Sequence, residues 1–200
     1  MPYKQIDPED QRKLHAELNQ IINQRFLLTT TAITVFGAFS AFMIPKTPVS
    51  SPAEVGHILI GGTVYLLTFY LLLFSWNRML LSLQEVISVY LELRGPSQWE
   101  ADFRRFVGLR PVGLRIQGWV FLVLGILSVS WPFAIATSLG VSFETPWLIL
   151  LATFATLYFL VMYFIGFRNR NQGRTRTTWE SVLKPEVSAD VTPKELKPGA

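Results

Sequence analysis

The chain has 200 residues, of which 50% are hydrophobic and only 16% are charged. Soluble proteins carry about 25% charged residues, and the apolar residues here lie in long runs, so the composition excludes a disordered chain and predicts a membrane protein. The chain has no cysteine, which excludes disulfide bonds, thiolate metal sites and a cysteine nucleophile.

Residues 1–25 mix acidic and basic side chains before any apolar run begins. A secretory signal peptide instead joins a short basic stretch to a cleavable apolar core, so we expect the first apolar run to remain in the protein. The sequence Asp7-Pro8-Glu9-Asp10 is typical of a helix start, because a capping aspartate, an early proline and acids suit the positive end of a helix. Apolar residues then recur at helical spacing, which predicts an amphipathic cytoplasmic helix that continues into the first span.

Four apolar runs are long enough to cross a bilayer. As a helix, about 19 residues reach roughly 28 Å, close to the hydrocarbon thickness of about 30 Å. We therefore expect an all-α protein, an integral membrane four-helix bundle with cytoplasmic helical extensions. Prolines predict an irregular loop at residues 45–57 between the first two spans. The four predicted spans cover about residues 26–44, 58–76, 116–136 and 146–167.

The segment between the second and third spans, residues 78–115, is predicted to begin as a continuation of the second helix. Up to Arg94 it contains no glycine or proline and is apolar apart from one narrow polar stripe, so it needs a partner. We expect that partner to be the amphipathic helix of residues 1–25, with which it would form a cytoplasmic stalk. The predicted stalk contacts are Leu14, Leu18, Ile21, Val86, Ile87 and Tyr90.

Two Trp-Glu patterns predict short capped helices. The first, Ser-Gln-Trp-Glu at residues 97–100, follows a Gly-Pro break, and we expect a loop at the membrane surface at residues 107–115. The second, Thr-Thr-Trp-Glu at residues 177–180, lies in a basic tail, residues 168–200, that is otherwise expected to be disordered. The tryptophan of each pattern is expected to lie on the membrane surface or to dock on the stalk.

Basic residues fix the expected orientation. All but one of the 18 lysine and arginine residues lie in residues 1–25, 78–115 and 168–200. Positive charge in short loops marks the cytoplasmic side, so both termini are expected there, in the cell (inner) membrane. The four arginines that follow the last span either contact anionic lipid, at about 1 kcal/mol each, or only set the topology. They are Arg168, Arg170, Arg174 and Arg176.

One face of the first span carries small residues at helical spacing. In lipid, small residues allow close approach of helices, because packing rather than the hydrophobic effect drives their association. The face therefore packs either inside one bundle, which we favour, or between copies of the chain. Its residues are Thr30, Thr34, Gly37, Ala38 and Ala41.

No predicted span contains Asp, Glu, Lys, Arg or His. Ion-coupled and proton-coupled transporters keep such residues at membrane depth, so the sequence argues against that class. A pore lined by hydroxyls or gated by apolar side chains stays open as an alternative.

The polar residues outside the spans indicate neither a metal site nor an active site. His15 and His57 are expected on opposite sides of the membrane, where they cannot share an ion, and we expect no cofactor. Glu54 and Glu144 are expected to be isolated, solvated acids. A membrane enzyme is the third choice, because the cytoplasmic acids have no histidine or cysteine beside them. Those acids are Glu85, Glu92, Glu100 and Asp102.

The sequence thus favours a non-enzymatic membrane subunit or scaffold whose cytoplasmic helices dock a partner or further copies of the chain. The alternative is a homo-oligomeric pore, channel or membrane-perturbing effector, with the small-residue face of the first span at the conduit. Expected partners are membrane lipid and either a second copy or another membrane subunit. Nucleic acid is not expected, since nothing in the tail forms a groove-reading fold.

Overall fold

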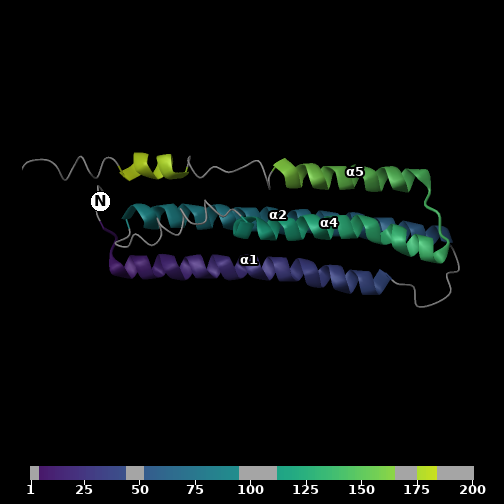
Figure 1. The fold of residues 1–200 in the computed structure, drawn as a ribbon, viewed down its shortest axis with the longest axis horizontal. Coiled ribbons are helices and arrows are strands. Elements are labelled where there is room, and N and C mark those ends of the chain that lie inside the picture. The colour runs from purple at the N-terminus through teal and green to yellow at the C-terminus, as the bar shows by residue number, and fades with distance from the viewer. Residues whose placement is uncertain (1–4, 44–51, 95–111, 165–174, 184–200) are drawn as a thin grey trace, which may run out of the picture. The chain divides into compact units, whose positions relative to one another are not determined.

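The computed structural model describes residues 5–43, 52–94, 112–164 and 175–183. The described residues form helices and no strand (Figure 1). Four of the helices are long and apolar enough to cross a membrane, which confirms the prediction of an all-helical, multi-pass membrane protein. These helices are α1 (Pro8–Met43), α2 (Pro52–Arg94), α4 (Val112–Leu139) and α5 (Thr145–Val161), and a short helix spans residues 175–183.

Helix α1 runs without a break from Pro8 to Met43, as its start pattern and apolar periodicity predicted. Asp7 accepts a hydrogen bond from the backbone N–H of Glu9 over 2.8 Å, so it caps the helix. The acidic first turn of α1 also suits the positive end of the helix dipole.

Two predicted loops are too long. The loop expected at residues 45–57 is wrong in its last part, because α2 already begins at Pro52. Proline is accommodated in the first turn of a helix, where its missing N–H would have no partner. The loop expected at residues 107–115 is wrong in its last part too, because α4 begins at Val112. Gly113 near the start of α4 lowers helix stability by about 1 kcal/mol, and the apolar run that follows it stabilises the helix by more than this. The short helix expected to start at residues 97–100 and to run to about Phe106 lies outside the described residues.

A tight corner joins α4 to α5. Gly140 has a φ of 65°, which favours glycine, and its N–H donates to the carbonyl of Thr137 over 3.4 Å. The N–H of Val141 donates to the carbonyl of Ala136 over 2.9 Å. This pair of bonds is the Schellman motif, which ends α4 and turns the chain toward α5.

The chain divides into two compact units. We call residues 23–81 and 110–170 the span unit, and residues 1–22, 82–109 and 171–200 the tail unit. Within the span unit, α1 and α5 lie on opposite sides of the pair formed by α2 and α4 (Figure 1). The most apolar windows of α2 and α4 are each 39% buried, against 11% for α1 and 17% for α5. Helices α2 and α4 therefore form the centre of the bundle.

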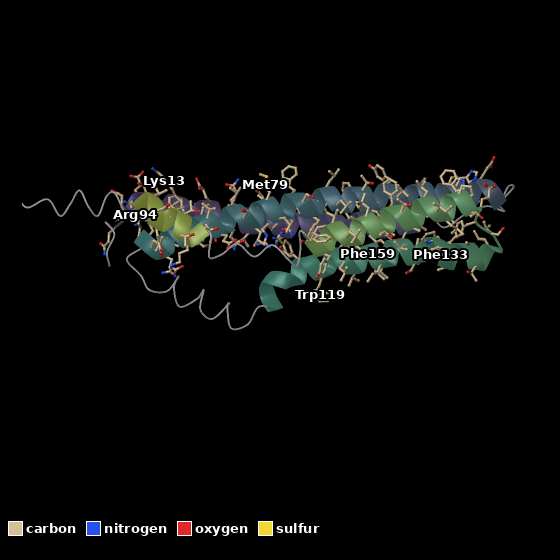
Figure 2. The ribbon with its side chains drawn as sticks, turned by 90° about the horizontal axis from the view of Figure 1, so that it is seen from above. Lys13, Met79, Arg94, Trp119, Phe133 and Phe159 are labelled. Atoms are coloured by element: carbon tan, nitrogen blue, oxygen red, sulfur yellow. The ribbon has the colours of Figure 1, made fainter. Side chains whose placement is uncertain are left out.

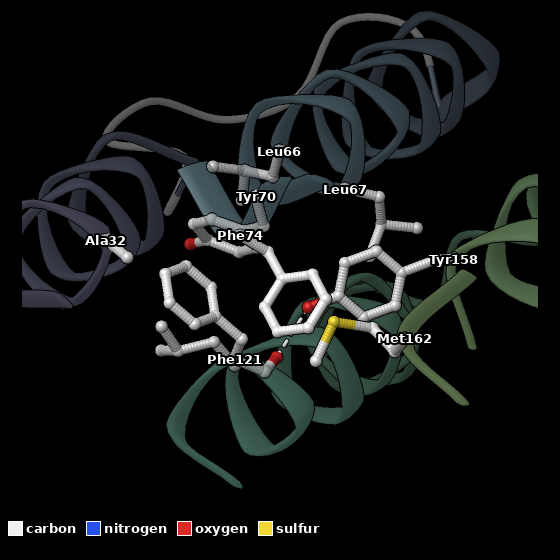
Figure 3. Packing of buried hydrophobic residues seen from close by; sticks show 9 residues of the cluster. Ala32, Leu66, Leu67, Tyr70, Phe74, Phe121, Tyr158 and Met162 are labelled. Atoms are coloured by element: carbon white, nitrogen blue, oxygen red, sulfur yellow. Dashed lines mark hydrogen bonds between the residues drawn. The ribbon is translucent and has the colours of Figure 1, made fainter. Parts of the chain in front are cut away.

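Aromatic side chains fill the core of the span unit (Figure 3). Tyr70 and Phe74 of α2, Phe121 of α4 and Tyr158 of α5 are almost fully buried. The Tyr158 hydroxyl donates to the backbone carbonyl of Phe121, which ties α5 to α4. Ala32 brings α1 against the same cluster.

The outside of the span unit is apolar. Met79 is 60% exposed and Trp119 is 52% exposed, and both point away from the bundle (Figure 2). Exposed phenylalanine, leucine and isoleucine side chains continue this surface along α1, α2, α4 and α5. Large exposed apolar side chains on all four helices suit contact with lipid tails.

The tail unit is organised around the last turns of α2. The first turns of α1 and the helix of residues 175–183 lie on opposite sides of those turns (Figure 1). The backbone N–H of Ile6 donates to the carbonyl of Arg94 over 3.2 Å, which ties the segment before α1 to the end of α2. These contacts bring three segments that are distant in sequence into one unit.

Candidate functional site

The helix of residues 175–183, which we call the tail helix, is anchored on α2 by Trp179. The indole Nε1 of Trp179 donates a hydrogen bond to the backbone carbonyl of Val86 over 3.2 Å. The Trp179 ring lies against Tyr90, with 4.8 Å between the ring centroids and 51° between the ring planes. An aromatic pair at this distance contributes about 0.5–1.5 kcal/mol beyond the burial of area.

Apolar packing surrounds this anchor. Leu183 lies one helical turn beyond Trp179 on the same face of the tail helix, and it is 2% exposed. It packs with Val89 and Leu93 of α2, which are also buried. The α2 residues that the tail helix contacts follow one another at intervals of one to three residues between positions 86 and 93, and they lie three or four residues apart across the helix turns, which places them on one face. We call this surface the docking face, and it comprises Val86, Val89, Tyr90 and Leu93.

A charged cluster orients the tail helix on α2. The guanidinium of Arg176 lies 3.3 Å from Oε1 of Glu92 and 2.9 Å from Oε1 of Glu180. Arg176 is half exposed, whereas the Glu92 side chain is only 11% exposed. Because the Arg176 side of the pair is open to water, its charge is screened and the pair contributes about 1 kcal/mol or less, so the cluster fixes the register of the helix more than it stabilises it.

The predicted lipid contacts are only partly described. Arg176 is paired with Glu92 in the tail unit, a protein contact that the sequence did not predict. Arg168, Arg170 and Arg174 lie outside the described residues. Lipid contact by these arginines stays a prediction.

The predicted stalk residues lie within the tail unit. Ile21 is buried, whereas Leu14, Leu18 and Ile87 are half-buried. Val86 and Tyr90, which were expected to face α1, contact Trp179 of the tail helix. Packing of Leu14 and Leu18 against α2 stays a prediction. From the sequence, Trp179 was expected either to lie on the membrane surface or to dock on the stalk, and the structure places it on α2.

The small-residue face of α1 points away from the bundle. Thr30, Thr34, Gly37, Ala38 and Ala41 are all exposed. A Cβ atom added at Gly37 would meet nothing within 4 Å. The side of α1 that packs on the core instead carries Ala32, with Phe36 and Phe39 beside it. The face therefore lacks the contacts that packing inside one bundle requires, and contact between copies stays a prediction.

Two other glycines allow helices to approach closely. A Cβ atom at Gly62 of α2 would overlap with Phe39 and Met43 of α1. A Cβ atom at Gly125 of α4 would overlap with the ring of Tyr158 of α5. These positions attach the outer helices α1 and α5 to the central pair. The sequence did not distinguish them from Gly37, because the rotation of each helix about its axis decides which glycine faces a neighbour.

A buried arginine joins three helices at one end of the span unit. Arg25 of α1 is 6% exposed. Its Nε donates to Oδ1 of Asn77 over 2.9 Å, and its Nη2 donates to Oε1 of Gln117 over 2.6 Å. Charge-assisted bonds of this kind offset the cost of removing a guanidinium from water. From the sequence, Arg25 was expected only to be one of the cytoplasmic basic residues, since its neutral partners Asn77 and Gln117 lie far away in sequence.

The opposite end of the span unit brings His57 beside Glu144, an acid that was expected to be isolated. The His57 ring lies 4.7 Å from the Trp147 ring between centroids, and its Nε2 lies 3.8 Å from Oε2 of Glu144. The prediction that Glu144 is isolated is therefore wrong, because the corner before α5 lies beside the start of α2. Within the described ranges, no three His, Cys, Asp or Glu side chains are grouped as a metal site would require.

Comparison with protein-family models, with curated proteins and with solved structures finds no match for this chain. What the site can bind is therefore inferred from its own residues alone. An apolar face, a ring pair, a hydrogen bond to a backbone carbonyl and one ion pair are the elements of helix-on-helix recognition.

Proposed function

We propose that the chain is a non-enzymatic membrane subunit or scaffold whose tail unit docks a partner protein or further copies of itself. The observation that carries the proposal is the docking of the tail helix on α2. A helix that continues beyond its apolar span and presents an apolar face provides a platform for another helix.

The interior of the span unit supports a structural role. Tyr70, Phe74, Phe121 and Tyr158 occupy the space between the helices. Dense packing of large rings resembles the interior of a structural core, and it leaves the bundle suited to anchoring the tail unit.

Orientation follows from charge in this proposal. Both termini and the segment after α2 face the cytoplasm, and the protein lies in the cell membrane, because nearly all basic residues belong to those segments. Anionic lipid at that surface attracts the arginines that follow α5.

Co-isolation from the native membrane tests this function. The wild-type chain should co-isolate with its partner in a fixed ratio of partner to chain. Trp179→Ala removes the anchor of the tail helix and should lose the partner. Val182→Ala is the matched control, since Val182 lies on the same helix and is 57% exposed. Retention of the same chains by all three proteins would contradict the proposal.

A homo-oligomeric pore or channel is the second candidate, and the exposure of the small-residue face of α1 favours it. Copies that met along this face would bring the hydroxyls of Thr30 and Thr34 to the contact. Conductance of the purified protein in planar bilayers tests this candidate. Ion flux that disappears in Gly37→Leu, but persists in Gly118→Leu, would favour the pore over the scaffold. A Cβ atom added at either glycine meets nothing within 4 Å in the single chain.

A further inference from the structure

The core of the span unit buries two tyrosine hydroxyls that differ in their bonding. Tyr70 of α2 and Tyr158 of α5 are both 0% exposed. The Tyr158 hydroxyl donates to the carbonyl of Phe121, as the dashed line in Figure 3 marks. The Tyr70 hydroxyl has no hydrogen-bond partner among the described residues. A hydroxyl buried without a bond is costly, most of all at membrane depth, where no lipid tail can replace the missing partner.

A second hydroxyl, on α4, lies beside that of Tyr70. Ser128 is 1% exposed, and its hydroxyl also has no hydrogen-bond partner within the part of the chain that the structure describes. Although the two side chains are neighbours, their oxygens do not bond directly to each other. Each of these hydroxyls can donate one hydrogen bond and accept others, so both require a further polar group.

A proline adds a third polar group to the same turn of α4. Pro132 lies inside α4, four residues after Ser128, and it is buried. Proline has no backbone N–H, so the Ser128 carbonyl lacks the donor that position 132 would normally supply. In membrane helices, a carbonyl freed in this way is satisfied by neighbouring side chains or by ordered water.

These three groups match what a buried water molecule requires. Buried waters make about three hydrogen bonds, typically to groups that would otherwise have no partner. Water can donate to the carbonyl and either donate to or accept from each hydroxyl. The near-complete burial of Tyr70 and Ser128 excludes a lipid headgroup or a larger ligand. A metal ion is excluded as well, because the four predicted spans contain no acidic side chain, histidine or cysteine.

We propose that the span unit binds one water molecule between α2 and α4, held by the hydroxyls of Tyr70 and Ser128 and by the Ser128 carbonyl. The water satisfies all three groups and joins the two central helices beside the aromatic core. This site lies entirely within the span unit, so it does not depend on the partner proposed for the tail unit.

Radiolytic hydroxyl labelling of the full chain in lipid nanodiscs tests the site. Ionising radiation converts water into hydroxyl radicals, so a buried ring is oxidised only where a bound water lies next to it. Peptide mass spectrometry should find oxidation of Tyr70 well above that of Tyr158, the matched control, which is equally buried but bonded to a carbonyl. The oxidation of Tyr70 should be lost in Ser128→Ala, which removes one of the groups that hold the water.

Denaturant titration in mixed micelles gives an independent readout. Tyr70→Phe should lower the midpoint of unfolding, because the water and the Ser128 groups lose a partner. Tyr65→Phe, on the same helix and 68% exposed, is the control and should leave the midpoint unchanged.

Two results would overturn the site. Oxidation of wild-type Tyr70 no higher than that of Tyr158 would do so whatever the stability of the variants, since a direct bond between the two hydroxyls could account for a lower midpoint. A midpoint of Tyr70→Phe at or above that of wild type would do so as well, because the hydroxyl would then hold nothing.

Discussion

Nε of Arg25 donates a hydrogen bond to Oδ1 of Asn77 over 2.9 Å across 52 residues of sequence. Arg25 is 6% exposed and Asn77 is 3% exposed, so neither group can turn to water when the other is lost. A charged donor is held by a neutral acceptor at the end of the span unit, and the same guanidinium also bonds to Gln117 of α4. The pair therefore fixes α1 to α2 at the point where the apolar run of α1 begins.

Removal of the Asn77 acceptor should destabilise the bundle. We expect Asn77→Ala to lower the free energy of unfolding by about 1–3 kcal/mol, because a buried charged donor loses a partner. Denaturant titration in mixed micelles measures the change. Asn23→Ala is the control, since Asn23 lies on α1 close to Arg25 and is exposed. Equal stability of the two variants would show that Arg25 does not depend on Asn77.

The close contact of α4 with α5 should not tolerate a methyl group. Gly125→Ala would place a Cβ atom against the Tyr158 ring, which is buried and held by its bond to the Phe121 carbonyl. We expect a loss of about 1–3 kcal/mol, typical of overpacking. Gly118→Ala in the same helix has open space and should be neutral or slightly stabilising. The same micelle titration compares them, and a neutral Gly125→Ala would contradict the packing described here.

The sequence predicted the helices because a bilayer restricts the chain so strongly. A run of about 20 apolar residues can satisfy its backbone in lipid only as a helix, so α1, α2, α4 and α5 follow from hydropathy. Their packing does not follow. Helical spacing identified Gly37 as a contact position, yet Gly62 and Gly125 make the close contacts. Spacing alone does not give the rotation of a helix about its axis.

The docking of the tail helix on α2 could likewise be predicted from the sequence only in part. The apolar character of residues 78–94 indicated a missing partner, and the Trp-Glu pattern indicated a short helix near Trp179. Neither pattern specified that Trp179 lies on Tyr90, because the hydrogen bond goes to the backbone carbonyl of Val86, which has no side-chain signature. Arg25 was missed for a related reason, since its partners are neutral amides.

Loss of the tryptophan anchor should release the tail helix. We expect Trp179→Ala to weaken docking by about 1.5–3 kcal/mol, from the lost hydrogen bond and ring contact. Amide hydrogen exchange in residues 175–183 should then accelerate by roughly tenfold to a hundredfold. Val182→Ala should leave the exchange close to that of wild type. Unchanged protection in Trp179→Ala would mean that Trp179 does not hold the helix.

The orientation proposed from charge has a direct test. Reporter fusions after Arg25, Gly108 and Ala200 should report the cytoplasm, because positively charged segments are retained there. Fusions at Ser50 and Ser142 should report the opposite side. Opposite sides for the two termini would be incompatible with four spans.

The mass of the particle extracted from its own membrane tests the scaffold proposal most directly. Native mass spectrometry of polymer-extracted nanodiscs, with lipid mass subtracted, counts the chains in each particle. We predict more than one chain per wild-type particle, one chain for Trp179→Ala, and the wild-type mass for Val182→Ala. A wild-type particle that contains a single copy and nothing else would contradict the account.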